Sequence, residues 1–159
     1  MKKQSNHTTT TSNLWQKNWD MTYLPGNIIC LEPSLLALIR LRVALMHGCQ
    51  LCIDTSVQAL KALGESTPRI EQLKSWRQNP LYDQSEQAAM ALTEALTALP
   101  SGPVPSQVVL QARNHFNEAE IVQVVLNVLA ANDWNDEFVH RPAAISQRRR
   151  CRDSHDEAS

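Results

Sequence analysis

Apolar residues recur at helical spacing through the middle of this chain. The first run extends from Leu35 to Met46, interrupted only by Arg40 and Arg42, and Gly48 follows it. Apolar residues three and four positions apart lie on one face of an α-helix and can be buried together. The pattern therefore predicts a helix that ends just before Gly48.

A second apolar run follows directly and carries Cys49 and Cys52 at its start. It continues to Leu63, and Gly64 stands where helices commonly end in a left-handed residue. The two runs are predicted to form a helical hairpin with the cysteines at the entrance to its second helix.

The next helix is predicted to begin with Thr67 as N-cap and Pro68 in the first turn. It should continue to Trp76 and break at residues 77–80, which end in a proline. An aromatic residue at helical spacing usually packs in a core or interface, and this is our expectation for Trp76.

Asp83 and Glu86 resemble a capping box ahead of an alanine-rich helix that ends at Pro100. Residues 101–105 form the clearest loop of the chain, since they contain one glycine and two prolines. A short helix is then predicted over residues 108–116.

Asn117 and Glu120 form a second such pair before a final long helix with apolar residues from Ile121 to Leu129. This helix is apolar on most of its circumference, which predicts burial on several sides and a subunit interface. No segment is typical of a strand, so the predicted fold class is all-α.

The ends of the chain lack this patterning. Residues 1–14 are polar and threonine-rich, and residues 141–159 have mixed charge without periodicity, so both are expected to be mobile tails. Residues 15–24 supply apolar bulk for a segment that docks on the main body. One all-α domain is therefore predicted over residues 15–140.

Composition narrows the function. The chain has 159 residues, of which 43% are hydrophobic and 5% aromatic, and this suits one core of packed aliphatic helices. A net charge of −1 argues against nucleic-acid or anionic-membrane partners. No apolar run approaches the roughly 20 residues of a membrane span, and no signal-peptide pattern is present. We expect a cytoplasmic protein.

The cysteine pair carries the most specific chemistry. Four cysteines are too few for a secreted disulfide scaffold, and Cys30 and Cys151 look incidental. Cys49 and Cys52 would lie on one face of a helix start, where they can close a disulfide and where free N–H groups favour the thiolate of the first. Such a pair can exchange electrons with a substrate or partner.

Two other interpretations of the pair stay open. Zinc normally needs four ligands, and beyond the pair the sequence offers only His47 nearby and Cys151 and His155 in the tail, so we predict no metal and no other cofactor. Alternatively, the pair consists of buried cysteines without redox chemistry, because free cysteines are commonly buried.

Three blocks of the chain follow one another as LIRLRVALMHGCQLCIDTSVQALKALGES, WRQNPLYDQSEQAAMALTEALT and VLAANDWND. In this order they resemble the alkylhydroperoxidase D-like (AhpD-like) branch of the carboxymuconolactone decarboxylase family, over roughly residues 34–140. The resemblance implies an all-α fold with a CxxC-bearing hairpin, assembled as a dimer, trimer or hexamer. It also implies reduction of hydroperoxides, with a thiol or dithiol partner, which can be a protein, as the electron donor.

The resemblance assigns roles to the two cysteines. Cys52 matches the family's peroxide-attacking cysteine, and Cys49 matches the more exposed resolving one. Attack by a Cys52 thiolate on a peroxide gives a sulfenic acid, which Cys49 converts to a disulfide that the reductant must reopen.

The chain departs from the family at the proton relay. Ser56 replaces the histidine four residues after the second cysteine, and Ala37 replaces the glutamate twelve residues before the first. Some members place another histidine directly before the second cysteine, where this chain has Leu51.

His47, two residues before the first cysteine, is therefore our candidate substitute base, and a capping or surface role is the alternative. Asp54 should lie on nearly the opposite helix face from Cys52 and be solvated. His115 and His140 fall outside the motif, and only folding or another subunit could bring them near.

Three functions follow. The favoured one is a thiol peroxidase or disulfide oxidoreductase that uses Cys49 and Cys52 and is weakened by the missing relay. The alternative, motivated by Ala37 and Ser56, is a non-catalytic oligomeric paralogue that serves as a binding or assembly module. A carboxymuconolactone-type decarboxylase is less favoured, because the chain keeps the CxxC pair and lacks the basic positions of such enzymes.

Overall fold

The computed structural model describes residues 31–140, with side chains described as far as residue 136. These residues form α2 (Pro33–His47), α3 (Gln50–Ala62), α4 (Thr67–Glu71), the 3₁₀ helix η2 (Gln72–Ser75), α5 (Gln84–Thr97), the 3₁₀ helix η3 (Leu99–Ser101), α6 (Ser106–His115) and α7 (Glu118–His140). Residues 31–140 contain no strand, and the all-α prediction is confirmed. The predicted tails at 1–14 and 141–159, and the predicted docking segment at 15–24, lie outside the described residues.

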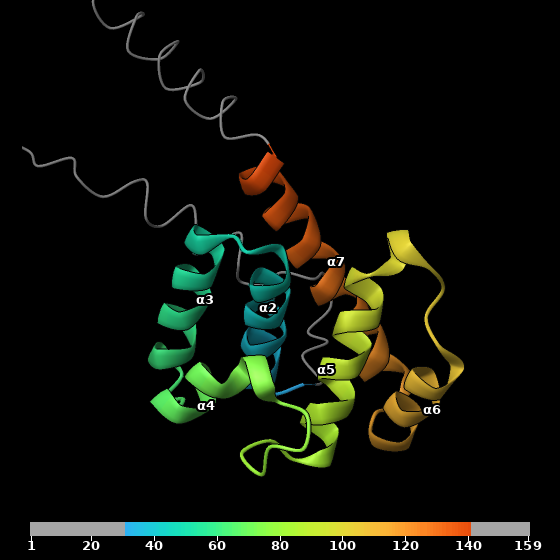
Figure 1. The fold of residues 1–159 in the computed structure, drawn as a ribbon. Helices are drawn as coiled ribbons and strands as arrows, with labels where there is room; N and C mark the ends of the chain where they lie inside the picture. The colour runs from blue at the N-terminus through green and yellow to red at the C-terminus, as the bar shows by residue number, and fades with distance from the viewer. Residues whose placement is uncertain (1–30, 141–159) are drawn as a thin grey trace, which may run out of the picture.

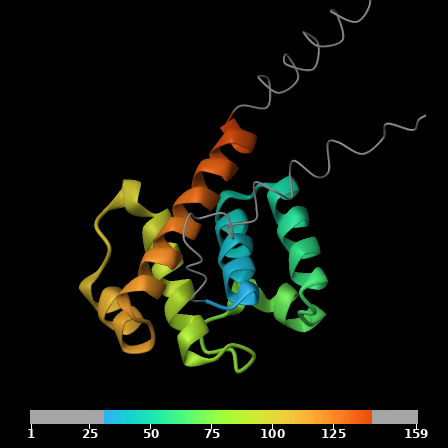
Figure 2. The ribbon, with the colours of Figure 1, turned by 180° about the vertical axis from the view of Figure 1, so that it is seen from behind.

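Helix α2 occupies the centre of the bundle and packs against α3, α5 and α7 (Figure 1). Helix α6 packs on α5 and α7, on the side of the bundle away from α3. Seen from behind, α7 runs alongside α2 in the same direction, so that its C-terminal half and the α2–α3 turn lie at one end of the molecule (Figure 2). None of the described helices is both long and apolar enough to cross a membrane.

The central position of α2 explains its almost continuous apolar sequence. Leu38, Ile39 and Val43 are fully buried because neighbouring helices cover several sides of α2. Each of the two arginines that interrupt the run forms a hydrogen bond with a side chain on another helix. Arg40 donates to Asn127 on α7 at 2.8 Å, and Arg42 donates to Glu94 on α5 at 2.8 Å.

Glu94 joins three parts of the bundle. Besides Arg42, its carboxylate accepts hydrogen bonds from Trp76 Nε1 at 2.7 Å and from Arg77 at 2.5 Å. Burial raises the pKa of the Glu94 carboxyl, but the hydrogen bonds from Arg77 and Trp76 and the charge of Arg42 outweigh it, so the pKa lies below its ordinary value. Trp76 is 4% exposed, which confirms its expected place in the core.

The local signals for helix ends are confirmed at four places. Gly48 ends α2 with φ of 67°, and Gly64 follows α3 with φ of 85°, a left-handed conformation that glycine adopts without strain. Asp83 forms a capping box with Glu86 at the start of α5. Asn117 Oδ1 accepts from the Glu120 N–H at 3.0 Å, and Glu120 Oε2 accepts from the Asn117 N–H at 2.8 Å.

The predicted helix from Thr67 to Trp76 is wrong in two details. Ser66 is the N-cap, so Thr67 is already the first helical residue, and the α-helix ends at Glu71 and continues as the 3₁₀ helix η2. A 3₁₀ helix has three residues per turn, so residues three positions apart lie on one face. This geometry keeps on the core side three buried residues, Ile70, Leu73 and Trp76.

Candidate active site around the cysteine pair

The two cysteines of the motif form a disulfide at the start of α3. Their Sγ atoms are 2.19 Å apart and their Cα atoms 5.3 Å apart. Cys49 is the N-cap residue, and its Sγ accepts a hydrogen bond from the Cys52 N–H at 3.3 Å. Sulfur thus takes the place of the side-chain oxygen that usually caps a helix. After reduction, this N–H and the positive end of the helix favour a thiolate at Cys49.

The disulfide is almost completely enclosed. Cys52 is 0% exposed and Cys49 is 6% exposed. Together with Ala44 they form a small cluster against which Ile53 and Trp134 pack. Cys49 is therefore the more exposed of the two, and it is the only one that offers surface to an attacking thiol.

Both positions of the missing relay are buried. Ala37 is 4% exposed in the core, on α2, and Ser56 is 3% exposed, one turn beyond Cys52 on α3. The Ser56 Oγ atom has no hydrogen-bond partner within the described part of the chain. Leu51, where some family members have a histidine, is 55% exposed and so projects away from the enclosed pair.

His47, the candidate substitute base, is engaged by α7. Its Nε2 lies 2.7 Å from Asn132 Oδ1, and its Nδ1 lies 3.7 Å from Asp136 Oδ1. The amide nitrogen of Asn132 donates to Val128 O at 3.0 Å, so the amide oxygen faces the imidazole and Nε2 carries the hydrogen. Both partners lie on α7 and neither is a cysteine, so the ring connects the end of α2 to α7.

The other titratable candidates lie apart from the sulfur atoms. Asp54 is exposed, as expected, and accepts a hydrogen bond from Gln50 at 2.8 Å. His115 is exposed at the end of α6, on the far side of the bundle from α3 (Figure 1). The side chain of His140 is not among those described. Among the side chains that are described, no group of three or more histidine, cysteine or acidic residues could hold a metal ion.

Two buried or packed residues near the end of α7 received no role from the sequence, and one of them, Trp134, reaches the site. Trp134 packs against the cysteine cluster. Asn135 is fully buried, and its Nδ2 donates to Ala131 O at 2.6 Å. Its Oδ1 accepts no hydrogen bond from the described residues. The sequence held no signal specific to Asn135, since α7 also buries the polar residues Gln123 and Asn127.

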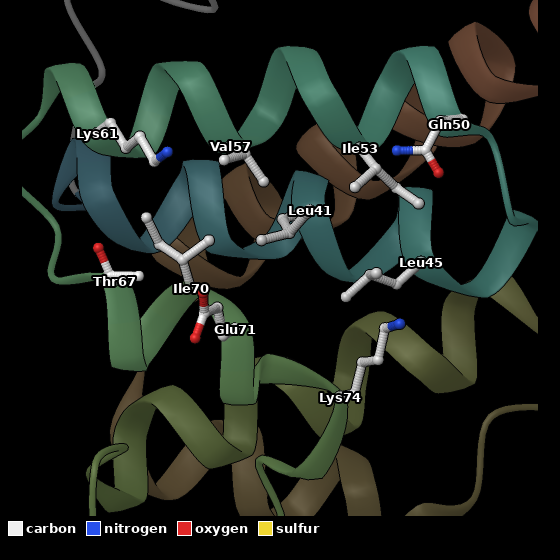
Figure 3. Close-up of a pocket in the computed structure, with 10 residues that line it drawn as sticks. All are labelled: Leu41, Leu45, Gln50, Ile53, Val57, Lys61, Thr67, Ile70, Glu71 and Lys74. Atoms are coloured by element: carbon white, nitrogen blue, oxygen red, sulfur yellow. The ribbon is translucent and has the colours of Figure 1, made fainter.

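A groove lies beside the site, between α2, α3 and the α4–η2 segment (Figure 3). Its volume is about 370 Å³. Its apolar lining consists of Leu41, Leu45, Ile53, Val57 and Ile70, and its polar lining of Gln50, Lys61, Thr67, Glu71 and Lys74. Ile53 both lines this groove and packs against the cysteine cluster, so one side chain contacts the two features.

Comparison with known proteins places this site in a family. The model of the carboxymuconolactone decarboxylase family matches residues 24–95. The uncharacterized protein YdfG of Bacillus subtilis is 37% identical over 98 residues, which are 62% of this chain and 67% of YdfG. This chain belongs to the carboxymuconolactone decarboxylase family. A second relative, the uncharacterized protein YnjA of Escherichia coli, is 32% identical over 71 residues, 44% of this chain and 38% of YnjA.

A solved structure locates the chain within the carboxymuconolactone decarboxylase family. It is the crystal structure of a protein of unknown function from Agrobacterium tumefaciens, for which a role as the antioxidant defence protein AhpD has been suggested. The TM-score is 0.69 at 30% identity, over 72% of this chain and 78% of that protein. The similarity confirms the AhpD-like helical fold and the AhpD-like branch of the family.

Proposed function

We propose that this protein is a thiol-dependent hydroperoxide reductase of the AhpD type that cycles between a Cys49–Cys52 dithiol and disulfide. The observation that carries the proposal is the disulfide itself, placed where a helix N-terminus stabilises a thiolate. Membership in the AhpD-like branch and the antioxidant role suggested for the Agrobacterium protein support a hydroperoxide as substrate.

The oxidative half of the cycle begins from the reduced pair. The Cys52 thiolate attacks one oxygen of the hydroperoxide, the O–O bond breaks, and the other oxygen leaves as an alcohol after protonation. Cys52 is then a sulfenic acid. The Cys49 thiolate attacks the sulfur of Cys52, the S–O bond breaks, and the oxygen leaves as water after protonation. The disulfide that forms is the product of the two-electron oxidation of the cysteine pair by the hydroperoxide.

The reductive half consumes a dithiol donor. One donor thiolate attacks Cys49, since only this cysteine is exposed at all, and Cys52 leaves as a thiolate. The second donor thiol then attacks the mixed disulfide, which releases oxidised donor and a Cys49 thiolate. Hydroperoxide and dithiol are thus converted to alcohol, water and a donor disulfide. The partner is a small dithiol or a protein with a dithiol that can approach the α2–α3 turn.

The test is peroxide consumption by the full chain with dithiothreitol as donor. Cys52→Ser should abolish consumption, and Cys49→Ser should leave a sulfenic acid on Cys52 that dimedone labels once per chain. Cys30→Ser is the matched control and should retain the wild-type rate. Unchanged turnover in Cys52→Ser would exclude the proposed mechanism.

A second function is favoured by the enclosure of both cysteines and by the replacement of the relay by Ala37 and Ser56. In this alternative the protein is a non-catalytic oligomeric paralogue that serves as a binding or assembly module. It predicts no turnover with any dithiol donor and a gain of turnover in the double variant Ala37→Glu, Ser56→His. Carbon dioxide release from a muconolactone-type substrate would instead identify a decarboxylase.

The same proposal includes assembly into a dimer, trimer or hexamer through α7. Three apolar residues at positions i, i+4 and i+7 of α7 form an exposed stripe, with Val122 54%, Leu126 39% and Leu129 47% exposed. Leu126→Glu places a charge in this stripe and should lower the mass measured by light scattering to that of the monomer. A wild-type mass of 17.9 kDa would contradict the assembly.

A further inference from the structure

Two buried polar atoms of the described residues lack hydrogen-bond partners, and one of them, Ser56 Oγ, lies one helical turn beyond Cys52. Within the described residues, Ser56 Oγ and Asn135 Oδ1 are the only buried side-chain nitrogen or oxygen atoms that make no hydrogen bond. Ser56 is 3% exposed and Asn135 is fully buried. A buried polar group without a partner costs free energy, and native structures contain few of them. Because Ser56 lies one helical turn from the redox pair, its unpartnered hydroxyl calls for an explanation.

Ser56 lies on the same face of α3 as Cys52. The two residues are four positions apart, and with Leu60 they form the buried stripe of the helix. Serine and threonine hydroxyls within helices often donate to the carbonyl oxygen four residues earlier. Thr55 does so to Leu51 O at 2.8 Å, and Thr93 does so to Ala89 O at 2.7 Å. The hydroxyl of Ser56 makes no such bond, so it is available to another acceptor.

Reduction of the disulfide supplies the acceptor that the Ser56 hydroxyl lacks. The disulfide sulfurs bear no charge. Addition of two electrons breaks the S–S bond, and a thiolate that results is a much stronger hydrogen-bond acceptor than a disulfide sulfur. We propose that Ser56 is a positioning residue for the reduced pair, and that it donates its hydroxyl to Cys52 in the thiolate form.

The consequence is a site that favours the dithiol over the disulfide. The hydrogen bond from Ser56 is made only in the reduced form, so it shifts the thiol–disulfide equilibrium toward reduction. The same bond from Ser56 stabilises Cys52 as the leaving group when a donor thiolate attacks Cys49. A hydroxyl donates to a thiolate without taking its proton, so this role differs from that of a base. The inference rests on the proposed dithiol cycle and concerns the equilibrium of its two forms.

The experiment measures that equilibrium without peroxide. The full chain is equilibrated in mixtures of reduced and oxidised dithiothreitol, and the oxidised fraction of the Cys49–Cys52 pair is read from alkylation and mass spectrometry. Ser56→Ala should shift the equilibrium constant about fivefold toward the disulfide, which corresponds to about 20 mV for a two-electron couple. Thr93→Val removes an equally buried hydroxyl from α5 and should leave it unchanged.

A second measurement separates a positioning role from a structural one. In the Cys49→Ser background, the pH at half-maximal rate of Cys52 alkylation by iodoacetamide should move upward when Ser56 becomes alanine. An unchanged equilibrium in Ser56→Ala, or an equal shift in Thr93→Val, would overturn the proposal. Absence of peroxide turnover, with the shift present, would refute only the proposed peroxidase activity.

Discussion

Substitution of His47 distinguishes a structural residue from a catalytic base. The imidazole is 20% exposed, and its Nε2 donates to Asn132 at 2.7 Å. A hydrogen bond of this kind contributes about 1 kcal/mol to stability. The 3.7 Å contact with Asp136, whose side chain is 58% exposed, adds about 0.5 kcal/mol or less, and only when the imidazole is protonated. His47→Ala is therefore expected to lower the free energy of unfolding by about 1–2 kcal/mol.

His47→Gln is the decisive comparison, because its amide nitrogen can replace Nε2 as the donor to Asn132 while the imidazole is lost. We expect this variant to recover most of the stability in urea unfolding followed by circular dichroism. Its reduced cysteines should react with iodoacetamide, and consume peroxide, within about twofold of the wild-type rate. Loss of a general base typically costs about 10²-fold or more. A hundredfold loss in a fully folded His47→Gln protein would refute the structural role.

Two further predictions concern stability. Because the pKa of Glu94 lies below its ordinary 4.5 in the folded chain, its ionised form contributes stability above that pH and loses it as the pH falls. Glu94→Gln should therefore lower the midpoint of urea unfolding at pH 7 and flatten its decline in acid; an unchanged acid limb would contradict this. Reduction of the disulfide, which closes a loop of about four residues, should cost at most about 2 kcal/mol of unfolding free energy, since short loops lose little entropy. Calorimetry with and without dithiothreitol measures this loss, and a much larger value would contradict the loop-entropy argument.

The helices of the hairpin could be predicted from the sequence because their signals are local. The apolar period, the left-handed Gly48 and the capping box at Asp83 each depend on residues within a turn or two of one another. The division of residues 67–75 into an α-helix and a 3₁₀ helix had no such signal. It follows from the burial of Ile70, Leu73 and Trp76 against other helices.

In the candidate site, too, the local features could be predicted from the sequence and the tertiary contacts could not. The spacing of Cys49 and Cys52 at a helix start was enough to predict that the sulfurs could bond, because four consecutive residues fix that geometry. The resemblance located Ser56 and the missing relay by position alone. Neither the cysteine spacing nor the resemblance indicated that Cys52 would be wholly enclosed or that the Ser56 hydroxyl would have no partner. The burial of Cys52 and the surroundings of Ser56 depend on which helices cover α3.

The sequence by itself determined the all-α class, the CxxC hairpin and the absence of the usual relay residues, since these follow from residue identity and short-range periodicity. Only the tertiary structure decided that His47 contacts α7 and that Asn135 comes to the level of the α2–α3 turn, 85 or more residues along the chain. Helix α7 reaches these positions because it packs along α2, and the residues that meet across two helices depend on how the whole bundle packs.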